Sequence, residues 1–191
     1  MTSISKQVKK AESTVFKIMN HCGFYKNWDD TKYLKLIYKI RTGETLNLDK
    51  PVTYNEKLQY LKLHDRKPEY SIMVDKYQAK AYVGKIIGMQ YIIPLLGVWD
   101  KFDDIDFSQL PASFVLKCNH DCGGVVICKD KSTFDKRVAK KKLEKHLKNN
   151  FYYYRREWPY KNVKPKLLCE QYMEDKADKE LKDYKVMCFS R

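Results

Sequence analysis

The spacing of apolar residues changes near residue 91, and this change limits the folds open to the chain. Before that point, apolar side chains recur every three or four residues, which is the helical period. After it, apolar and aromatic residues gather in short runs bounded by Pro, Gly or charged residues, which is typical of strands. We therefore predict an α+β protein, with a helical N-terminal lobe over residues 1–90 and a strand-containing region over residues 91–191.

Three amphipathic segments predict the helices of the first half. The first covers Lys32–Arg41, and Gly43 follows it as a stop signal. The second begins after Thr53, a residue type that caps helix N-termini. The third spans Ser71–Ile87. Together they predict a compact helical lobe.

The second half combines short strands with one helix. Pro94 prevents a helix from continuing where the strand-like runs begin. A strongly basic helix with apolar residues along one side is predicted over Phe134–Asn149. The predicted strands are Tyr91–Pro94, Leu95–Trp99, Phe114–Cys118, Val125–Cys128, Lys166–Glu170 and Tyr184–Phe189.

The formal net charge of +14 is large for 191 residues. It implies attraction to phosphate, to an anionic polymer or to an anionic membrane face, although Lys-rich faces that only keep a chain in solution give the same charge. The start of the chain has no apolar run long enough for a signal peptide, so we expect a cytoplasmic protein, with the inner membrane face as one place of action. The six cysteines mostly lie in apolar runs, where we expect reduced thiols.

Lys117 lies inside the apolar run Phe114–Cys118, and Gly123 and Gly124 follow it. Burying an ammonium group without a partner is costly, so we expect an anion nearby. Glycines in a hairpin let backbone N–H groups approach phosphate oxygens closely. A lysine that reaches solvent from a two-sided strand, beside an ordinary hairpin, explains the same residues.

Two further runs carry polar residues at strand ends. Glu170 could accept a hydrogen bond from the exocyclic amine of a purine, while the main chain near Met173 binds the purine edge. Alternation places Asp183 and Lys185 on one face of a strand, where a carboxylate suits sugar hydroxyls and an ammonium group suits phosphate. An acidic strand end and an ion pair on a solvated sheet are the ordinary alternatives.

Six short motifs occur in order along the chain: Asp75-Lys-Tyr, Ile93-Pro-Leu-Leu-Gly-Val-Trp, Phe114-Val-Leu-Lys-Cys-Asn-His, Arg156-Glu-Trp-Pro-Tyr, Glu170-Gln-Tyr and Asp183-Tyr-Lys. A stretch that begins at Gly43 and includes Pro51 and Asn55 precedes them. Together they resemble the ordered motifs and the helical lead-in of the TupA-like ATP-grasp family, which is found in bacterial cell-surface polysaccharide and teichuronopeptide biosynthesis. The resemblance covers nearly the whole chain.

This resemblance implies an ATP-grasp-like fold with a mainly antiparallel sheet, and ATP held between two α+β lobes. The chain would be an ATP-dependent carboxylate–amine ligase. ATP would phosphorylate a carboxylate on a glycan or peptide, and an amine would attack the acyl phosphate to form an amide. Whether a partner chain or a second copy of this chain joins it is left open by the sequence.

The resemblance also implies which residues bind ATP. Three lysines would contact the phosphates, two glycines would cover them, and Glu170 with the main chain of Met173 would hold adenine. Asp183 would reach the ribose. Matched by motif, the ATP-binding residues are Lys76, Lys117, His120, Gly123, Gly124, Glu170, Met173, Asp183 and Lys185.

Two features depart from the family pattern. The family carries its magnesium-binding acidic and Asn residues well beyond the Asp-Tyr-Lys strand, so the magnesium ligands would lie beyond Arg191. Asp121 and Cys122 stand where the family's phosphate loop usually has small residues, which places a carboxylate beside bound phosphate. We therefore expect a C-terminally truncated or divergent member that binds nucleotide weakly and whose catalytic competence is open.

Three other functions compete with this one. The basic helix and the aromatic run that begins at Phe151 would suit a nucleic-acid-binding module, although no recognised motif is present. A non-catalytic scaffold would dock Lys-rich helices on the anionic membrane face or on a lipid-linked glycan. A zinc site is the third, but no CxxC pair occurs. Its ligands would be Cys118, His120, Cys122 and Cys128.

Overall fold

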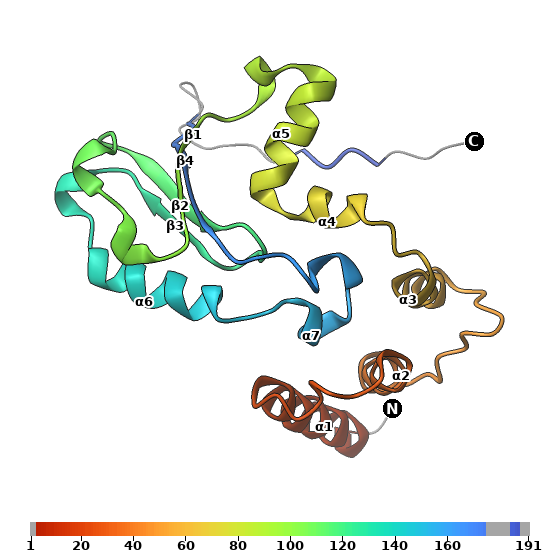
Figure 1. The fold of residues 1–191 in the computed structure, drawn as a ribbon. Coiled ribbons are helices and arrows are strands. Elements are labelled where there is room, and N and C mark those ends of the chain that lie inside the picture. Colours follow the sequence, from red (N-terminus) through yellow and green to blue (C-terminus); the bar gives the residue numbers. More distant parts are fainter. Residues whose placement is uncertain (1–2, 175–183, 188–191) are drawn as a thin grey trace.

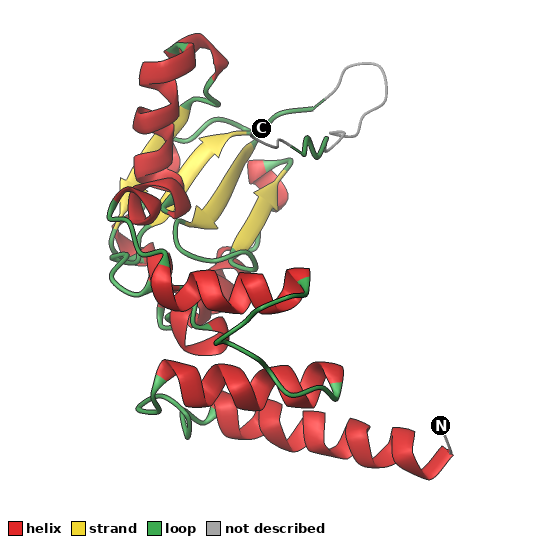
Figure 2. Cartoon of the chain, turned by 90° about the vertical axis from the view of Figure 1, so that its right-hand side faces the viewer, coloured by secondary structure: helices red, strands yellow, loops and turns green. Residues whose placement is uncertain are grey.

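The structure is a computed structural model that describes residues 3–174 and 184–187. Its first part is helical, with α1 (Ser3–His21), α2 (Asp30–Thr42) and α3 (Tyr54–His64). These helices stack on one another, apart from the sheet (Figure 1 and Figure 2). No helix was predicted over the residues of α1. No helix in the described part of the chain is both long enough and apolar enough to cross a membrane.

Local capping explains where α2 and α3 begin and end. The Asp29 side chain accepts a hydrogen bond from the Lys32 N–H (3.1 Å) at the start of α2. Gly43 ends α2 with φ 82°, a left-handed conformation that glycine adopts without strain. Thr53 and Glu56 form a capping box at the start of α3, in which each side chain accepts from the other residue's backbone N–H. Both predicted helices are confirmed.

The predicted helix Ser71–Ile87 is divided in two, so this part of the prediction was wrong. α4 (Glu69–Val74) ends at Asp75, whose extended backbone (φ −76°, ψ 105°) interrupts the helix. α5 (Lys76–Ile87) begins directly after it. The Asp75 side chain accepts a hydrogen bond from the Tyr77 N–H (2.9 Å), which caps the new helix. The break gives α5 a direction different from that of α4 and places it beside the sheet (Figure 1).

Four strands form one sheet: β1 (Leu95–Trp99), β2 (Phe114–Cys118), β3 (Val125–Cys128) and β4 (Leu167–Gln171). Their order is β1-β4-β2-β3, and each neighbouring pair is antiparallel. A hairpin joins β2 to β3, whereas β4 comes from far along the chain and lies between β1 and β2. The prediction of an α+β fold with an antiparallel sheet is therefore confirmed.

Two of the predicted strands do not form. The segment 91–94 contains no strand, because the chain makes a 3-10 turn over Met89–Tyr91 and then runs irregularly to β1. Residues 184–187 form no strand either, and the rest of the predicted strand Tyr184–Phe189 lies outside the described residues. The other four predictions agree with β1 to β4 to within one residue at each end.

One face of the sheet packs against α6 (Lys136–Leu147), as the apolar side of the predicted basic helix requires. The Asp135 side chain caps α6 by accepting from the Arg137 N–H (2.9 Å). Alternate residues of β2 and β4 face this helix and are buried, which is the expected two-residue period. The buried residues of this core are Phe102, Ile105, Leu110, Phe114, Leu116, Cys118, Cys128, Ala139, Leu143, Leu167 and Cys169.

A second core holds the N-terminal helices together, and Arg156 ties it to the rest of the protein. Arg156 follows α7 (Tyr152–Arg155) and is 1% exposed. Its Nη2 donates a hydrogen bond to the Tyr25 carbonyl (2.5 Å), and its guanidinium group lies 4.4 Å from the centre of the Tyr33 ring. The domain boundary at residue 90 stays a prediction, and α5, which precedes it, lies beside the sheet.

Candidate functional site

The face of the sheet opposite α6 carries charged side chains. Lys117 on β2 and Glu170 on β4 point to this face, because their neighbours Leu116, Cys118 and Cys169 lie in the core under α6. The Lys117 Nζ lies 2.5 Å from Glu170 Oε2. Both residues were predicted to bind ATP, and the structure brings them together.

Lys80 of α5 joins this pair and was not among the predicted site residues. Its Nζ lies 2.8 Å from Glu170 Oε1 and donates a hydrogen bond to the Ile93 carbonyl (2.7 Å). The Glu170 side chain is only 4% exposed, and two ammonium groups contact its single carboxylate, which leaves one positive charge in excess. One signal was available in the sequence: Lys80 follows Lys76 by four residues, a spacing that puts two side chains on one helix face.

Lys76 opens α5 and reaches the β2–β3 hairpin. Its backbone N–H donates to the Asn119 carbonyl (3.1 Å), and its Nζ donates to the carbonyls of Asn119 and Asp121. Burial lowers the pKa of Lys76, the charge of Asp121 opposes this shift, and the Lys117 ammonium group adds to it. We call Lys76, Lys80, Lys117 and Glu170 the lysine cluster.

His120 is 2% exposed and holds the hairpin in place. Its Nδ1 lies 3.1 Å from Asn119 Oδ1, and its Nε2 lies 2.8 Å from the Asn149 carbonyl. Asn119 in turn donates to Asp75 Oδ1 (3.0 Å) and accepts from the Lys166 N–H (2.8 Å). These contacts fix the start of the hairpin against α5 and the residue before β4. A direct contact of His120 with ATP stays a prediction.

The glycines of the hairpin allow it to lie close to α6. A Cβ atom on Gly124 would come within 2.8 Å of Cys118 Sγ, and one on Gly123 within 2.7 Å of His146 Cε1. The Asp121 carboxylate, which was expected to weaken phosphate binding, is buried in the hairpin. It accepts from the Gly124 N–H (3.0 Å) and contacts the His146 ring. In this conformation the Gly124 N–H is therefore already bonded, and a phosphate would have to displace Asp121.

The remaining predicted residues follow β4. Met173 lies shortly beyond the strand and is 43% exposed. Lys185 is exposed. Asp183 lies outside the described residues, so its predicted contact with ribose has no structural counterpart here. Among the predicted site residues, the structure gathers Lys76, Lys117 and Glu170 on the α5 side of the sheet.

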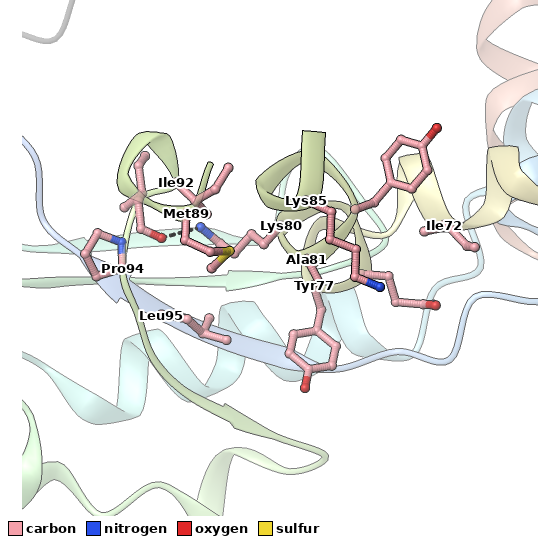
Figure 3. Close-up of a pocket in the computed structure, with 12 residues that line it drawn as sticks. Ile72, Tyr77, Lys80, Ala81, Lys85, Met89, Ile92, Pro94 and Leu95 are labelled. Carbon is pink, nitrogen blue, oxygen red and sulfur yellow. Dashed lines mark hydrogen bonds between the residues drawn. The ribbon is translucent and has the colours of Figure 1, made fainter. Parts of the chain in front are cut away.

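An apolar pocket of about 760 Å³ lies between α5 and the start of β1 (Figure 3). Its walls include Tyr77, Lys80 and Ala81 from α5 and Leu95 from β1. Because Leu95 pairs with Glu170 across β1 and β4, and Lys80 belongs to both features, the pocket adjoins the lysine cluster. Apolar walls beside a few charged groups are typical of small-molecule sites.

The cysteines do not support the zinc alternative. Over residues 3–174 and 184–187, no group of three or more His, Cys, Asp or Glu side chains is placed to hold a metal ion. Cys118 and Cys128 lie in the core under α6, whereas Cys122 is exposed. Burial raises the pKa of the Cys118 thiol to about 12, as expected for a thiol packed in an apolar core.

The aromatic run considered for nucleic-acid binding is used partly inside the protein. Tyr152 is 4% exposed, and its hydroxyl donates to Asp30 Oδ1 (2.5 Å). Phe151 packs against Tyr160, with ring centres 5.3 Å apart. The run therefore offers less stacking surface than its sequence indicates.

The sequence matches the model of a known protein family. A family model described as TupA-like ATPgrasp matches residues 56–191. The matched segment begins in α3 and contains the whole sheet, the hairpin and the lysine cluster. Neither the curated proteins nor the solved structures compared with the chain gave a match. Because the family match extends over most of the chain, the protein belongs to the TupA-like ATP-grasp family.

Proposed function

We propose that the chain binds ATP at the lysine cluster, as the nucleotide-binding part of an ATP-dependent carboxylate–amine ligase. Membership of the ATP-grasp family supports a ligase-like function in general. The lysine cluster carries the proposal, because Lys80 and Lys117 both contact Glu170 and the Lys76 ammonium group lies close enough to act on Lys117. Three ammonium groups therefore stand against two carboxylates, those of Glu170 and Asp121. This surplus of positive charge suits a polyphosphate.

Each member of the cluster has a distinct proposed role. Lys76 would bind phosphate oxygens at the N-terminus of α5, where the helix dipole also favours negative charge. Lys80 and Lys117 would exchange the Glu170 carboxylate for phosphate oxygens. Glu170 would then accept from the adenine amine, and the apolar pocket beside Lys80 would bury the base. The roles of Met173, Asp183, Lys185 and the hairpin stay as the family resemblance implies them.

Bound ATP would supply the phosphoryl group that activates a carboxylate for attack by an amine. We propose that this carboxylate belongs to a glycan or peptide of cell-surface polysaccharide biosynthesis, in the cytoplasm or at the inner membrane face. The ammonium groups would stabilise the negative charge that moves during transfer. Among the described residues no group of three or more His, Cys, Asp or Glu side chains is placed to hold a metal ion, so no step is assigned to magnesium.

Calorimetric titration of the full chain with ATP, with and without magnesium, tests the proposal. Lys117→Gln removes one ammonium group and keeps a hydrogen-bond donor. We expect the ATP affinity to fall at least tenfold, because a charge-assisted hydrogen bond contributes roughly 1.5–3 kcal/mol. Lys80→Gln should have a similar effect. AMP should bind more weakly than ATP, since it presents fewer phosphate oxygens to the cluster.

The matched control is Lys145→Gln, which changes an exposed lysine of α6 on the other side of the sheet. This variant should bind ATP as the unchanged protein does. Equal ATP affinities of the Lys117 and Lys145 variants would refute the proposed site. A folded chain that does not bind ATP at all would refute the function itself.

A further inference from the structure

Two adjoining hollows lie between the N-terminal helices and α7, outside the lysine cluster. Their volumes are about 270 Å³ and 380 Å³. Arg41 of α2 and Arg155 of α7 line both hollows, which we therefore treat as one feature, the basic cleft. Lys62 of α3 lines the smaller hollow, and Lys17 and His21 of α1 line the larger one.

Among the residues that the structure describes, no carboxylate lines the basic cleft. Two acidic residues of the neighbouring elements are engaged in other contacts. Asp30 of α2 pairs with Arg66 (2.8 Å), and Glu56 accepts from backbone N–H groups at the start of α3. Glu157 acts electrostatically on Lys62 but does not line the cleft. The cleft therefore has a clear surplus of positive charge.

Lys62 is buried among the other cations of the cleft, and their charges act on it. Its Nζ donates a hydrogen bond to the Arg155 carbonyl (3.1 Å). Burial lowers the pKa of Lys62, Glu157 opposes this shift, and the charges of Arg41 and Arg155 add to it. A bound anion would stabilise all three cations, because it supplies the negative charge that their surroundings lack.

The other lining residues indicate what carries the anion. Asn55 and Gln59 of α3 line the smaller hollow, and Phe151 and Tyr154 line the larger one. Amides bind hydroxyl groups as donors and acceptors, aromatic rings pack on the apolar faces of sugar rings, and guanidinium groups bind carboxylate or phosphate through paired N–H groups. Hollows of this volume hold a small molecule.

We propose that the basic cleft binds an anionic sugar, with Arg41 and Arg155 on its carboxylate or phosphate group. The larger hollow also reaches Cys122, in the hairpin whose Asp121 carbonyl accepts from Lys76. The cleft therefore adjoins the segment that leads to the lysine cluster. The binding of an anionic sugar to the cleft does not depend on the proposed function. The further step, that this sugar is the substrate of the ligase, rests on the proposed function.

Titration of the full chain with glucuronate and with glucose 1-phosphate, in the absence of ATP and followed by calorimetry or NMR, tests the cleft. Neutral glucose and inorganic phosphate are the comparison probes. At least one of the two anionic sugars should bind roughly tenfold more tightly than glucose or inorganic phosphate. Whichever anionic sugar binds more tightly shows whether the cleft prefers a carboxylate or a phosphate group. Arg41→Gln and Arg155→Gln should each weaken that binding about tenfold. Circular dichroism would confirm that both variants are folded.

The matched control is Arg137→Gln, which changes an exposed arginine of α6 that does not line the cleft. It should leave sugar binding unchanged. Lys117→Gln should also leave sugar binding unchanged, because Lys117 does not line the cleft, so the two proposed sites are tested separately. Equal binding of glucose or inorganic phosphate would overturn the inference. So would equal losses in the Arg41 and Arg137 variants, a loss of ATP binding in Arg41→Gln, or binding of an RNA oligonucleotide but of neither sugar.

Discussion

Phe114, Leu116 and Cys118 of β2 face α6 and are 0% exposed, whereas Lys117 of the same strand faces α5 and its side chain is 21% exposed. The α6 face is an apolar layer in which burial raises the pKa of the Cys118 thiol to about 12. The α5 face holds Lys117 in an ion pair with the carboxylate of Glu170. One strand thus supplies the core on one side and a charged cluster on the other.

This difference shows how the fold separates stability from binding. Side chains of a strand alternate between two faces, so neighbouring residues lie in different environments. Residues that face α6 contribute the free energy of unfolding through burial. Lys117 on the α5 face keeps partial exposure, so a ligand can reach it. Substitutions on the two faces should therefore differ in kind as well as in size.

The largest effect is expected on the α6 face. Phe114→Ala should lower the free energy of unfolding by about 3–5 kcal/mol, because it leaves a cavity in a fully buried layer. Ile127→Ala, on β3 but 56% exposed, is the control and should cost less than about 1 kcal/mol. Chemical denaturation measures both. Similar losses in the two variants would contradict the assignment of the core to the α6 face.

Local signals account for what the sequence predicted correctly. The capping box of Thr53 and Glu56 and the stop at Gly43 each depend on a few neighbouring residues, so the ends of α2 and α3 could be predicted. The break at Asp75 could not, because the apolar period runs through it without interruption. Asp75 is fixed instead by a hydrogen bond from Asn119 Nδ2 (3.0 Å), which comes from a distant part of the chain.

The candidate site was predictable only in pieces. Lys117 and Glu170 each stood out as a charged residue in an apolar run. Their contact, however, depends on β4 lying beside β2, and the order of strands in the sheet could not be predicted from these runs. Lys80 joins them because α5 lies beside the same sheet face. Arg41 and Arg155 meet for a similar reason, since the folding of α7 onto the N-terminal helices brings them together.

A smaller effect is expected from removing the carboxylate of the lysine cluster. Glu170→Gln should lower the free energy of unfolding by roughly 1–3 kcal/mol, because two ammonium groups lose their partner while both keep some access to water. Inorganic tripolyphosphate should then raise the melting temperature of this variant more than that of the unchanged protein. Thermal unfolding with and without tripolyphosphate measures both quantities.

Glu144→Gln is the control for that experiment. Glu144 pairs with Lys140 at 3.8 Å on α6 and is 39% exposed, so its loss should change the free energy of unfolding by less than about 0.5 kcal/mol. It should also leave the response to tripolyphosphate unchanged. If both variants respond to tripolyphosphate alike, the polyanion acts on the overall positive charge and the cluster has no special affinity for phosphate.

The smallest effect concerns the pH dependence of stability at Lys76. Its pKa is lowered by burial, so folding disfavours the ammonium form. This cost is fully present below the folded-state pKa, falls as pH rises through that value, and vanishes above the ordinary lysine value of about 10.4. Lys76→Gln removes the cost, so its stability relative to the unchanged protein should decline as pH rises from 7 towards that limit.

Lys145→Gln, at an exposed lysine, is the control, and its difference in free energy of unfolding from the unchanged protein should stay constant over the same range. Denaturation curves at several pH values compare the two variants. A constant difference for Lys76→Gln as well would mean that Lys76 is as solvated as the exposed Lys145. The contrast between the two faces would then depend on Lys80, Lys117 and Glu170 alone.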